Sequence, residues 1–330
     1  MTVEHAFAPF IRALGKGKQG SRDLSEIEAC QAMKMMLTEE ALPMQVGAFL
    51  MLMRVKEETP EELAGFARAV QESLVLPAQQ PEVRLDWSAY AGKRRQLPWF
   101  VLSALLLAQK GIPVFMHGTV GFDADRIFVP AALEALGVPE CMTLAEAAAA
   151  IECHNFAFVR LENFSPTLGD MLQLRPILGL RSPVHSIARM LNPMGASAIM
   201  LGIFHPGYRD IHQGAAKLLG VKRAAVLKGE GGEAERNPDG PCIVKAVMGD
   251  EVFEEEWPAL FATRHLKDET MDLSRLGAVW RGEASDEYGE AAVIGTAAIA
   301  LWTLGEAGSP ADAEALARQL WASRSPALPA

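Results

Sequence analysis

A basic turn between two apolar segments constrains the fold of this chain more than any other stretch. Apolar residues alternate over 83–87, Gly92 then permits a turn, and residues 101–109 are apolar almost all round. Residues 112–116 again have the pattern of a strand. Alternation is typical of a strand, and a helix that is apolar on every side is typical of a buried helix. The stretch therefore predicts a β-α-β unit.

Three consecutive cations, Lys93, Arg94 and Arg95, lie just before the predicted helix, whose first turn contains Pro98. Backbone N–H groups and the helix dipole favour an anion at such a position. We therefore expect a phosphate group to bind there. The alternative is a solvated basic turn without a ligand.

The remaining pattern predicts an α+β protein with a small all-helical domain and a larger α/β domain, whose central, mostly parallel sheet is flanked by helices. Residues 1–76 are expected to form the helical domain, with capping boxes at Asp23–Glu26 and at Thr59–Glu62. Helices within 167–193 are expected to join it. The α/β domain is assigned to 82–166 and 194–330. Strands are expected at 83–87, 112–116, 155–160, 198–203, 223–228, 242–247 and 251–254, and antiparallel pairing stays open for the last two.

Composition limits the class of protein. The chain has 330 residues, half of them hydrophobic, which is enough for two domains. No uninterrupted apolar run reaches about 18 residues, so no membrane span is expected. The first residues do not have the pattern of a secretory signal. Four scattered cysteines without a CxxC pair predict a reduced, cytoplasmic protein without a zinc site.

Charge is unevenly distributed along the chain. The net charge of −10 argues against a nucleic-acid partner. However, residues 160–228 contain nine Lys or Arg and three acids, and residues 92–127 contain five basic and two acidic residues. The local field matters more to a ligand than the net charge. A basic face on an acidic body is therefore expected.

Several motifs together carry a family resemblance. They are the helical stretch 41–65, Leu133-Glu-Ala-Leu-Gly-Val138, Leu174-Arg-Pro-Ile-Leu-Gly-Leu-Arg181 and Leu191-Asn-Pro193. Over nearly its whole length the chain resembles the anthranilate phosphoribosyltransferases, which are nucleoside-phosphorylase-type enzymes of glycosyltransferase family 3. The resemblance implies a homodimer formed through the N-terminal helical domain. It also implies a cleft for phosphoribosyl pyrophosphate and magnesium, in which an amine displaces pyrophosphate.

The chain departs from this family at the positions that carry the chemistry. The family's pyrophosphate loop, Gly-Thr-Gly-Gly-Asp-Gly, corresponds to residues 91–98, where Gly92 alone remains. The family's Lys-His-Gly-Asn is here Met116-His117-Gly118-Thr119, so its lysine and asparagine are missing. The metal-binding Asp-Glu falls on Ala234 and Glu235. A single carboxylate is a poor magnesium anchor, so no metal or other cofactor is expected.

These losses favour a polyanion as the ligand, because side-chain cations pair with successive phosphates without base-specific geometry. The pattern is similar to the non-catalytic YbiB-type branch of the family, which implies a dimer that binds DNA or RNA with little sequence specificity along a basic groove. Tyr90 and Trp99 are candidates for stacking on bases, although Trp99 also fits a core position. The expected phosphate contacts are Gly92, Lys93, Arg94, Arg95, Arg175, Arg181, Arg189 and Lys228, where Arg175 aligns with an enzyme arginine that contacts the aromatic acid.

Two other functions stay open. The first is an active glycosyl or phosphoribosyl transferase with an altered acceptor, which would need magnesium and phosphoribosyl pyrophosphate and would use the residual active-site equivalents His117, Gly118 and Glu235. The second is a scaffold whose basic residues only balance surface acids. The segment 229–240 contains little apolar material, and its glutamates are expected to be solvated.

Overall fold

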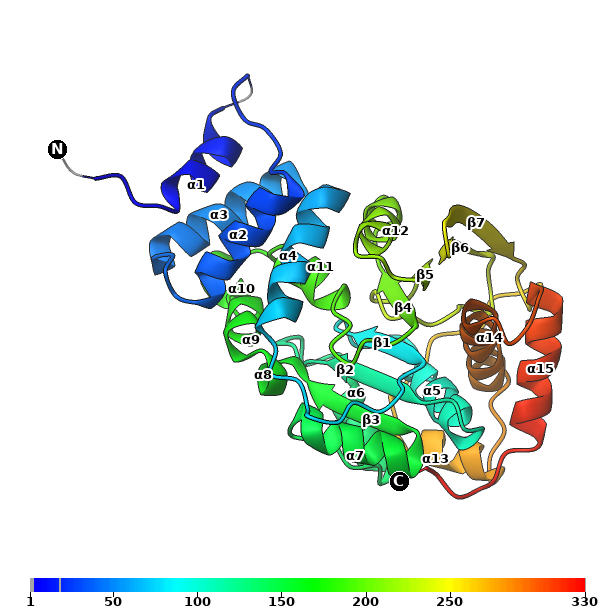
Figure 1. Ribbon diagram of the computed structural model, residues 1–330. Coiled ribbons are helices and arrows are strands. Elements are labelled where there is room, and N and C mark those ends of the chain that lie inside the picture. Colours follow the sequence, from blue (N-terminus) through cyan, green and yellow to red (C-terminus); the bar gives the residue numbers. More distant parts are fainter. Residues whose placement is uncertain (1–2, 18, 330) are drawn as a thin grey trace.

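The structure, a computed structural model, describes residues 3–17 and 19–329. A small helical part lies beside a larger α/β part built on a seven-stranded sheet (Figure 1). This arrangement confirms the predicted fold class. None of the helices in the described part of the chain is long and apolar enough to span a bilayer.

The helical part is built on aromatic packing. Phe7, Phe49 and Phe66 meet edge to face and are buried. Gly65 lets two helices approach closely, since a Cβ there would lie 2.2 Å from the carbonyl oxygen of Glu26. The chain's first four helices and four later ones contribute: α1 (Ala8–Gly15), α2 (Glu26–Leu37), α3 (Pro43–Lys56), α4 (Pro60–Ser73), α8 (Leu161–Phe164), α9 (Pro166–Leu172), α10 (Arg175–Leu178) and α11 (Val184–Arg189).

Two helix starts test the predicted caps. Helix α4 has the predicted capping box, in which Thr59 and Glu62 bond each other's backbone N–H groups. Helix α2 starts later than predicted, because Ser25 caps it together with Glu28. Asp23 instead pairs with Lys56. The prediction of a box at Asp23–Glu26 was therefore wrong by two residues.

The sheet has the strand order β3-β2-β1-β4-β5-β6-β7. The first five strands in this order are parallel, whereas β6 and β7 are antiparallel additions at one edge. The strands are β1 (Leu85–Ala89), β2 (Val114–Gly118), β3 (Phe156–Arg160), β4 (Ala198–Ile203), β5 (Arg223–Lys228), β6 (Cys242–Met248) and β7 (Glu251–Trp257). All seven lie within three residues of the predicted positions.

Alternating strand residues divide the core between the two faces of the sheet. Trp87 and Met200 belong to one apolar cluster, whereas Ile199 and Leu201 belong to another, shared with the helical part. The first face is covered by α5 (Phe100–Gln109), α6 (Val129–Leu136), α13 (Ser274–Arg281), α14 (Glu287–Leu304) and α15 (Pro310–Ala322), and the other by α7 (Leu144–His154), α11 and α12 (Tyr208–Leu218).

The topology gathers four loops at the carboxyl ends of the parallel strands. They follow β1, β2, β4 and β5, and they comprise residues 90–99, 119–128, 204–207 and 229–241. In open α/β sheets this edge is where ligands bind. The predicted basic turn is the first of these loops.

Candidate functional site

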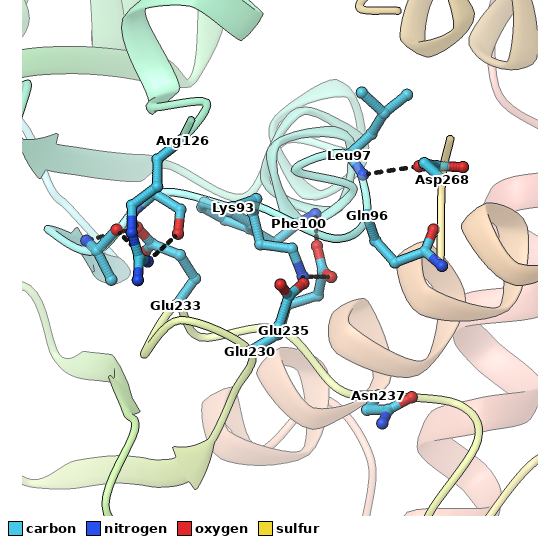
Figure 2. A network of polar contacts seen from close by, with 12 residues as sticks. Lys93, Gln96, Leu97, Phe100, Arg126, Glu230, Glu233, Glu235, Asn237 and Asp268 are labelled. Carbon is cyan, nitrogen blue, oxygen red and sulfur yellow. Dashed lines mark hydrogen bonds and ion pairs between the residues drawn. The ribbon is translucent and has the colours of Figure 1, made fainter. Parts of the chain in front are cut away.

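The turn after β1 is held from both sides by the rest of the chain (Figure 2). The N–H groups of Ala91 and Gly92 donate to Oε1 of Glu233, at 2.7 and 2.5 Å. Nη1 of Arg126 donates to the carbonyl oxygens of the same two residues, at 2.9 and 3.0 Å. The backbone N–H groups that were expected to bind a phosphate therefore already have a carboxylate partner.

Lys93 is an internal cation. Its side chain is 1 % exposed, and its Nζ contacts carboxylate oxygens of Glu235 and Glu230 at 2.5 and 3.0 Å. Burial alone would lower the pKa of Lys93, but these two carboxylates outweigh it and the pKa is raised. The prediction that Lys93 contacts a ligand phosphate was therefore wrong, because its side chain is buried and its charge is paired with two internal carboxylates.

The first turn of α5 also binds an internal anion. The helix begins at Phe100 rather than at Pro98, and the N–H of Phe100 donates to Oε2 of Glu235 at 2.8 Å. A carboxylate at a helix N-terminus is stabilised by the free N–H groups and the helix dipole. The predicted anion site thus exists, but Glu235 occupies it.

The loop after β5 is packed rather than solvated. Glu233 and Glu235 are buried, and burial raises the pKa of both carboxyl groups despite their hydrogen bonds. Gly232 has a φ of +103°, and a Cβ on Gly231 would lie 2.6 Å from the carbonyl oxygen of Gly92. The glycines therefore let this loop reach the turn after β1, and the expectation of solvated glutamates was wrong.

The residual active-site equivalents are engaged elsewhere. His117 is fully buried, with Nδ1 2.6 Å from the Tyr90 hydroxyl and Nε2 3.0 Å from Oδ1 of Asp86. Gly118 is required by packing, since a Cβ there would lie 2.1 Å from the Ala89 carbonyl oxygen. The stacking candidates Tyr90 and Trp99 are both buried, so neither offers a face to a base.

No metal site follows from these residues. Among residues 3–17 and 19–329, no group of three or more His, Cys, Asp and Glu side chains is arranged to hold an ion. Glu235, the residual equivalent of the family's metal-binding pair, already bonds Lys93 and Phe100. The residues present thus do not fit a magnesium–diphosphate unit.

Arginines gather instead around Asp123, in the loop after β2. Oδ1 of Asp123 lies 2.9 Å from Nη1 of Arg175, and Oδ2 lies 3.1 Å from Arg181 and 3.3 Å from Arg126. Burial alone would raise the pKa of Asp123, but the three guanidinium groups lower it. Burial lowers the pKa of Arg181, and Arg126 and Arg175 act in the same direction. One carboxylate therefore balances three cations.

Three adjoining hollows open along this cluster, with volumes of about 20, 260 and 140 Å³. The first and second share Asp123, Arg175 and Arg181. The second and third share Arg181, Phe204 and His205. We call them together the arginine groove; its basic lining is Arg54, Arg94, Arg126, Arg175, Arg181 and Arg189, and its acidic lining is Glu58, Asp123 and Asp125.

The other expected phosphate contacts divide between the groove and the outside. Arg94 is exposed on the groove, 3.6 Å from Asp125, and Arg95 is exposed without an ion pair to any described residue. Arg189 is buried in the wall, where it donates to the carbonyl oxygens of Gly202 and His185. Lys228 is exposed but does not line any of the three hollows.

Two exposed aromatic residues beside the arginines were missed by the sequence analysis. Phe122 and Phe204 are 57 % and 52 % exposed, and they line the first hollow and the other two, respectively. The available signal was their position in the loops after two parallel strands: Phe204 follows β4 directly, and Phe122 follows Gly121 in the loop after β2. Guanidinium groups with aromatic rings suit a ligand that combines phosphates with flat rings.

Comparison with known families decides which scaffold this is. A model of a glycosyl transferase family's helical bundle domain matches residues 8–74, and the model of its a/b domain matches residues 101–323. The chain belongs to this glycosyl transferase family. The first match covers α1 to α4, and the second covers the later helices of the helical part and every strand except β1.

The relatives of this glycosyl transferase family member include both enzymes and uncharacterised proteins. It is 31 % identical to an anthranilate phosphoribosyltransferase from Aquifex aeolicus over 68 % of this chain and 66 % of that protein. It is 29 % identical to the uncharacterised protein YbiB from Escherichia coli over 70 % of this chain and 73 % of that protein. The predicted resemblance to an anthranilate phosphoribosyltransferase-like family with YbiB-type members is thereby confirmed.

Solved structures show the same fold. The anthranilate phosphoribosyltransferase from Thermus thermophilus superposes with a TM-score of 0.79 at 25 % identity, covering 97 % of this chain and 95 % of that one. The Saccharomyces cerevisiae enzyme in complex with PRPP and Mg superposes with a TM-score of 0.78 at 17 % identity, covering 97 % and 94 %. The chain therefore shares the fold of these enzymes over nearly its whole length.

Proposed function

We propose that this chain is a nucleic-acid-binding protein of little sequence specificity, on a degenerate anthranilate phosphoribosyltransferase scaffold. The observation that carries the proposal is the cluster in which Arg126, Arg175 and Arg181 share one carboxylate, Asp123, at the centre of the arginine groove. Excess guanidinium charge along a groove pairs with successive phosphates of DNA or RNA.

The exposed rings and the filled turn support the same function. Phe122 and Phe204 offer flat faces next to the cations, and stacking on aromatic side chains is tolerant of sequence. Glu233 and Glu235 take up the N–H groups that would otherwise hold a diphosphate. The groove thus favours a strand with many phosphates over a single diphosphate.

The salt dependence of binding tests this function. The double variant Arg175→Gln/Arg181→Gln removes two groove cations. In a plot of log affinity against log salt concentration for a single-stranded oligonucleotide, each phosphate contact contributes about 0.7 to the steepness of the slope. The slope of the double variant is therefore expected to be shallower than that of the parent by about 1.4. Fluorescence anisotropy over a salt series measures it. The control Lys222→Gln/Arg281→Gln removes the same charge outside the groove and should keep the slope. Binding that does not respond to salt, or no binding at low salt, would refute the proposal.

An active phosphoribosyl or glycosyl transferase with an altered acceptor is the second candidate, favoured by the anthranilate phosphoribosyltransferases among the relatives. It requires Glu233 and Glu235 to leave the turn after β1, where both are buried. Release of pyrophosphate from phosphoribosyl pyrophosphate with a panel of amine acceptors tests it. Turnover that is lost in an Arg175→Gln variant would favour this candidate.

We also propose a homodimer formed through the helical domain. Ile27, Met44 and Val55 on α2 and α3 are 71 %, 78 % and 82 % exposed, so both helices present apolar side chains that a second copy could cover. Met44→Glu is expected to weaken self-association in sedimentation velocity experiments. Leu266→Glu, at an exposed apolar residue of the α/β part, is the control. A Met44→Glu variant that sediments like the parent would contradict this dimer.

A reducing compartment such as the cytoplasm is the location that we propose. All four cysteines are free thiols, and Cys141 and Cys242 are buried. Free thiols persist where glutathione and thioredoxin keep them reduced. Cell fractionation with a marker for each compartment tests this location.

A further inference from the structure

Asp123 lies at the centre of the arginine groove, and its contacts are those of a bound anion. Oδ1 and Oδ2 lie 2.9 and 3.1 Å from Nη1 of Arg175, and Oδ2 also accepts from Arg181 at 3.1 Å. Nε of Arg126 lies 3.3 Å from the same oxygen. Guanidinium groups bind carboxylates and phosphates with the same planar set of donors. The carboxylate of Asp123 therefore takes up donors that would suit a ligand phosphate.

The three arginines differ in how firmly they are held. Arg126 is fixed from the side of the turn after β1, since its Nη1 donates to two carbonyl oxygens of that turn (Figure 2). Arg175 and Arg181 have side chains that are 39 % and 40 % exposed, and Asp123 is their one ion-pair partner among the described residues. Two of the three cations can therefore pair with another anion once Asp123 leaves them.

Asp123 can leave the arginines without a change of fold. Its loop is held through the backbone, because the N–H of Arg126 donates to the carbonyl oxygen of Asp123 at 3.0 Å, and Ile127 is hydrogen-bonded in both directions to Lys93. The side chain of Asp123 is 27 % exposed, and ion pairs that reach solvent are weak. Rotation of one short side chain toward solvent is therefore enough to release Arg175 and Arg181.

A phosphate group has room beside this carboxylate. The hollow of about 260 Å³ opens there, and its charged lining is Arg94, Asp123, Asp125, Arg126, Arg175 and Arg181. A phosphate that entered while Asp123 stayed in place would meet a negative charge among the donors that it needs, and like charges at close range repel. Asp123 and a ligand phosphate thus compete for the same guanidinium groups.

We propose that Asp123 is a built-in competitor of the ligand, which pairs with the arginines in the free protein and is displaced when a phosphate of the nucleic-acid strand binds. The proposal rests on the proposed function and adds a regulation of the same site. Displacement of Asp123 weakens every ligand by the same factor. A strand that also meets other cations of the groove still binds, whereas a single phosphate has no further contacts to offset the loss.

Removal of one negative charge tests this competition. Asp123→Asn keeps the size of the side chain and removes its charge. Fluorescence anisotropy with a single-stranded oligonucleotide over a salt series is expected to show about tenfold tighter binding at low salt. The slope of log affinity against log salt should become steeper by about 0.7, which corresponds to one further phosphate contact. The unfolding temperature should not rise, because the guanidinium groups lose their shared partner.

Two further variants separate displacement from a change in total charge. Glu152→Gln removes the same charge from an exposed position on α7, outside the groove, and should leave the affinity for the oligonucleotide unchanged. Asp125→Asn removes the neighbouring carboxylate of the same loop, which is 61 % exposed and lies 3.6 Å from Arg94 alone. Its affinity should rise by less than about twofold, because a single exposed pair contributes little.

The opposite outcomes overturn defined parts. Unchanged or weaker binding by Asp123→Asn would show that Asp123 does not compete with the ligand, and weaker binding would show that it positions the arginines instead. Equal gains for Asp123→Asn and Glu152→Gln would reduce the effect to total charge. Each of these results refutes the competition and leaves the proposed function standing. No binding at low salt by either the parent or Asp123→Asn refutes both.

Discussion

Lys93 holds two carboxylates together in the interior, and its replacement has a defined cost. Lys93→Met would leave Glu235 buried without its cation, and loss of one partner of a buried pair typically costs about 3–5 kcal/mol. We expect the free energy of unfolding in urea to fall by this amount. Arg95→Met, at the exposed neighbour, should change it by less than about 0.5 kcal/mol. Similar losses for both variants would contradict the assignment of Lys93 as an internal cation.

Lys93 also shows where reasoning from sequence fails at the scale of single residues. The run Lys93-Arg94-Arg95 was expected to be one basic surface, but only Arg94 and Arg95 are exposed. The partners of Lys93 are Glu230 and Glu235, more than 130 positions later in the chain. No local pattern indicates that a distant loop will supply two carboxylates, so Lys93 looked like its neighbours.

At the scale of elements, α12 carries an acid-sensitive group. Burial lowers the pKa of His212 from 6.5 to about 4, and the nearby Arg189 acts in the same direction. Between these values the unfolded chain binds a proton that the native state does not, so stability falls as the pH falls through this window. The slope contributed by one such group reaches about 1.4 kcal/mol per pH unit.

Urea denaturation at about pH 7 and about pH 5.5 measures this loss together with that of His185, whose pKa burial lowers to about 3. His212→Gln should reduce the difference in unfolding free energy between the two conditions. His154→Gln, at the exposed end of α7, is the matched control and should leave the difference unchanged. An equal pH response of both variants would rule out His212 as the source.

Most elements were predictable because their signals are local. The box of Thr59 and Glu62 and the apolar run of α5 lie within one turn or one helix. The exceptions are instructive, since Ser25 and Glu28 offered a second box two residues beyond the predicted one. Two possible capping boxes thus lie in one stretch before α2. Which of them forms depends on how α2 packs against α4, and this contact is not visible in the local sequence.

At the scale of the whole molecule, the loop after β5 packs against the turn after β1, where the family resemblance implies a diphosphate. We therefore expect phosphoribosyl pyrophosphate with Mg²⁺ to give no saturable rise in the unfolding temperature. A bound ligand at a hundred times its Kd would add about 2.7 kcal/mol. Differential scanning fluorimetry measures this shift, and the Saccharomyces cerevisiae enzyme, solved with PRPP and Mg, is the positive control. A saturable shift would show that Glu233 and Glu235 give way to the ligand.

The amino-acid sequence by itself determined the two-part α+β fold and the strand positions, because periodicity and motifs are properties of neighbouring residues. Only the tertiary structure decided which charges are free. It buried Lys93 and His117, brought Glu233 and Glu235 to the turn after β1, and gathered Arg126, Arg175 and Arg181 around Asp123. These pairings join loops that are distant in the chain and meet at the carboxyl edge of the sheet, where strand order rather than sequence order sets the neighbours.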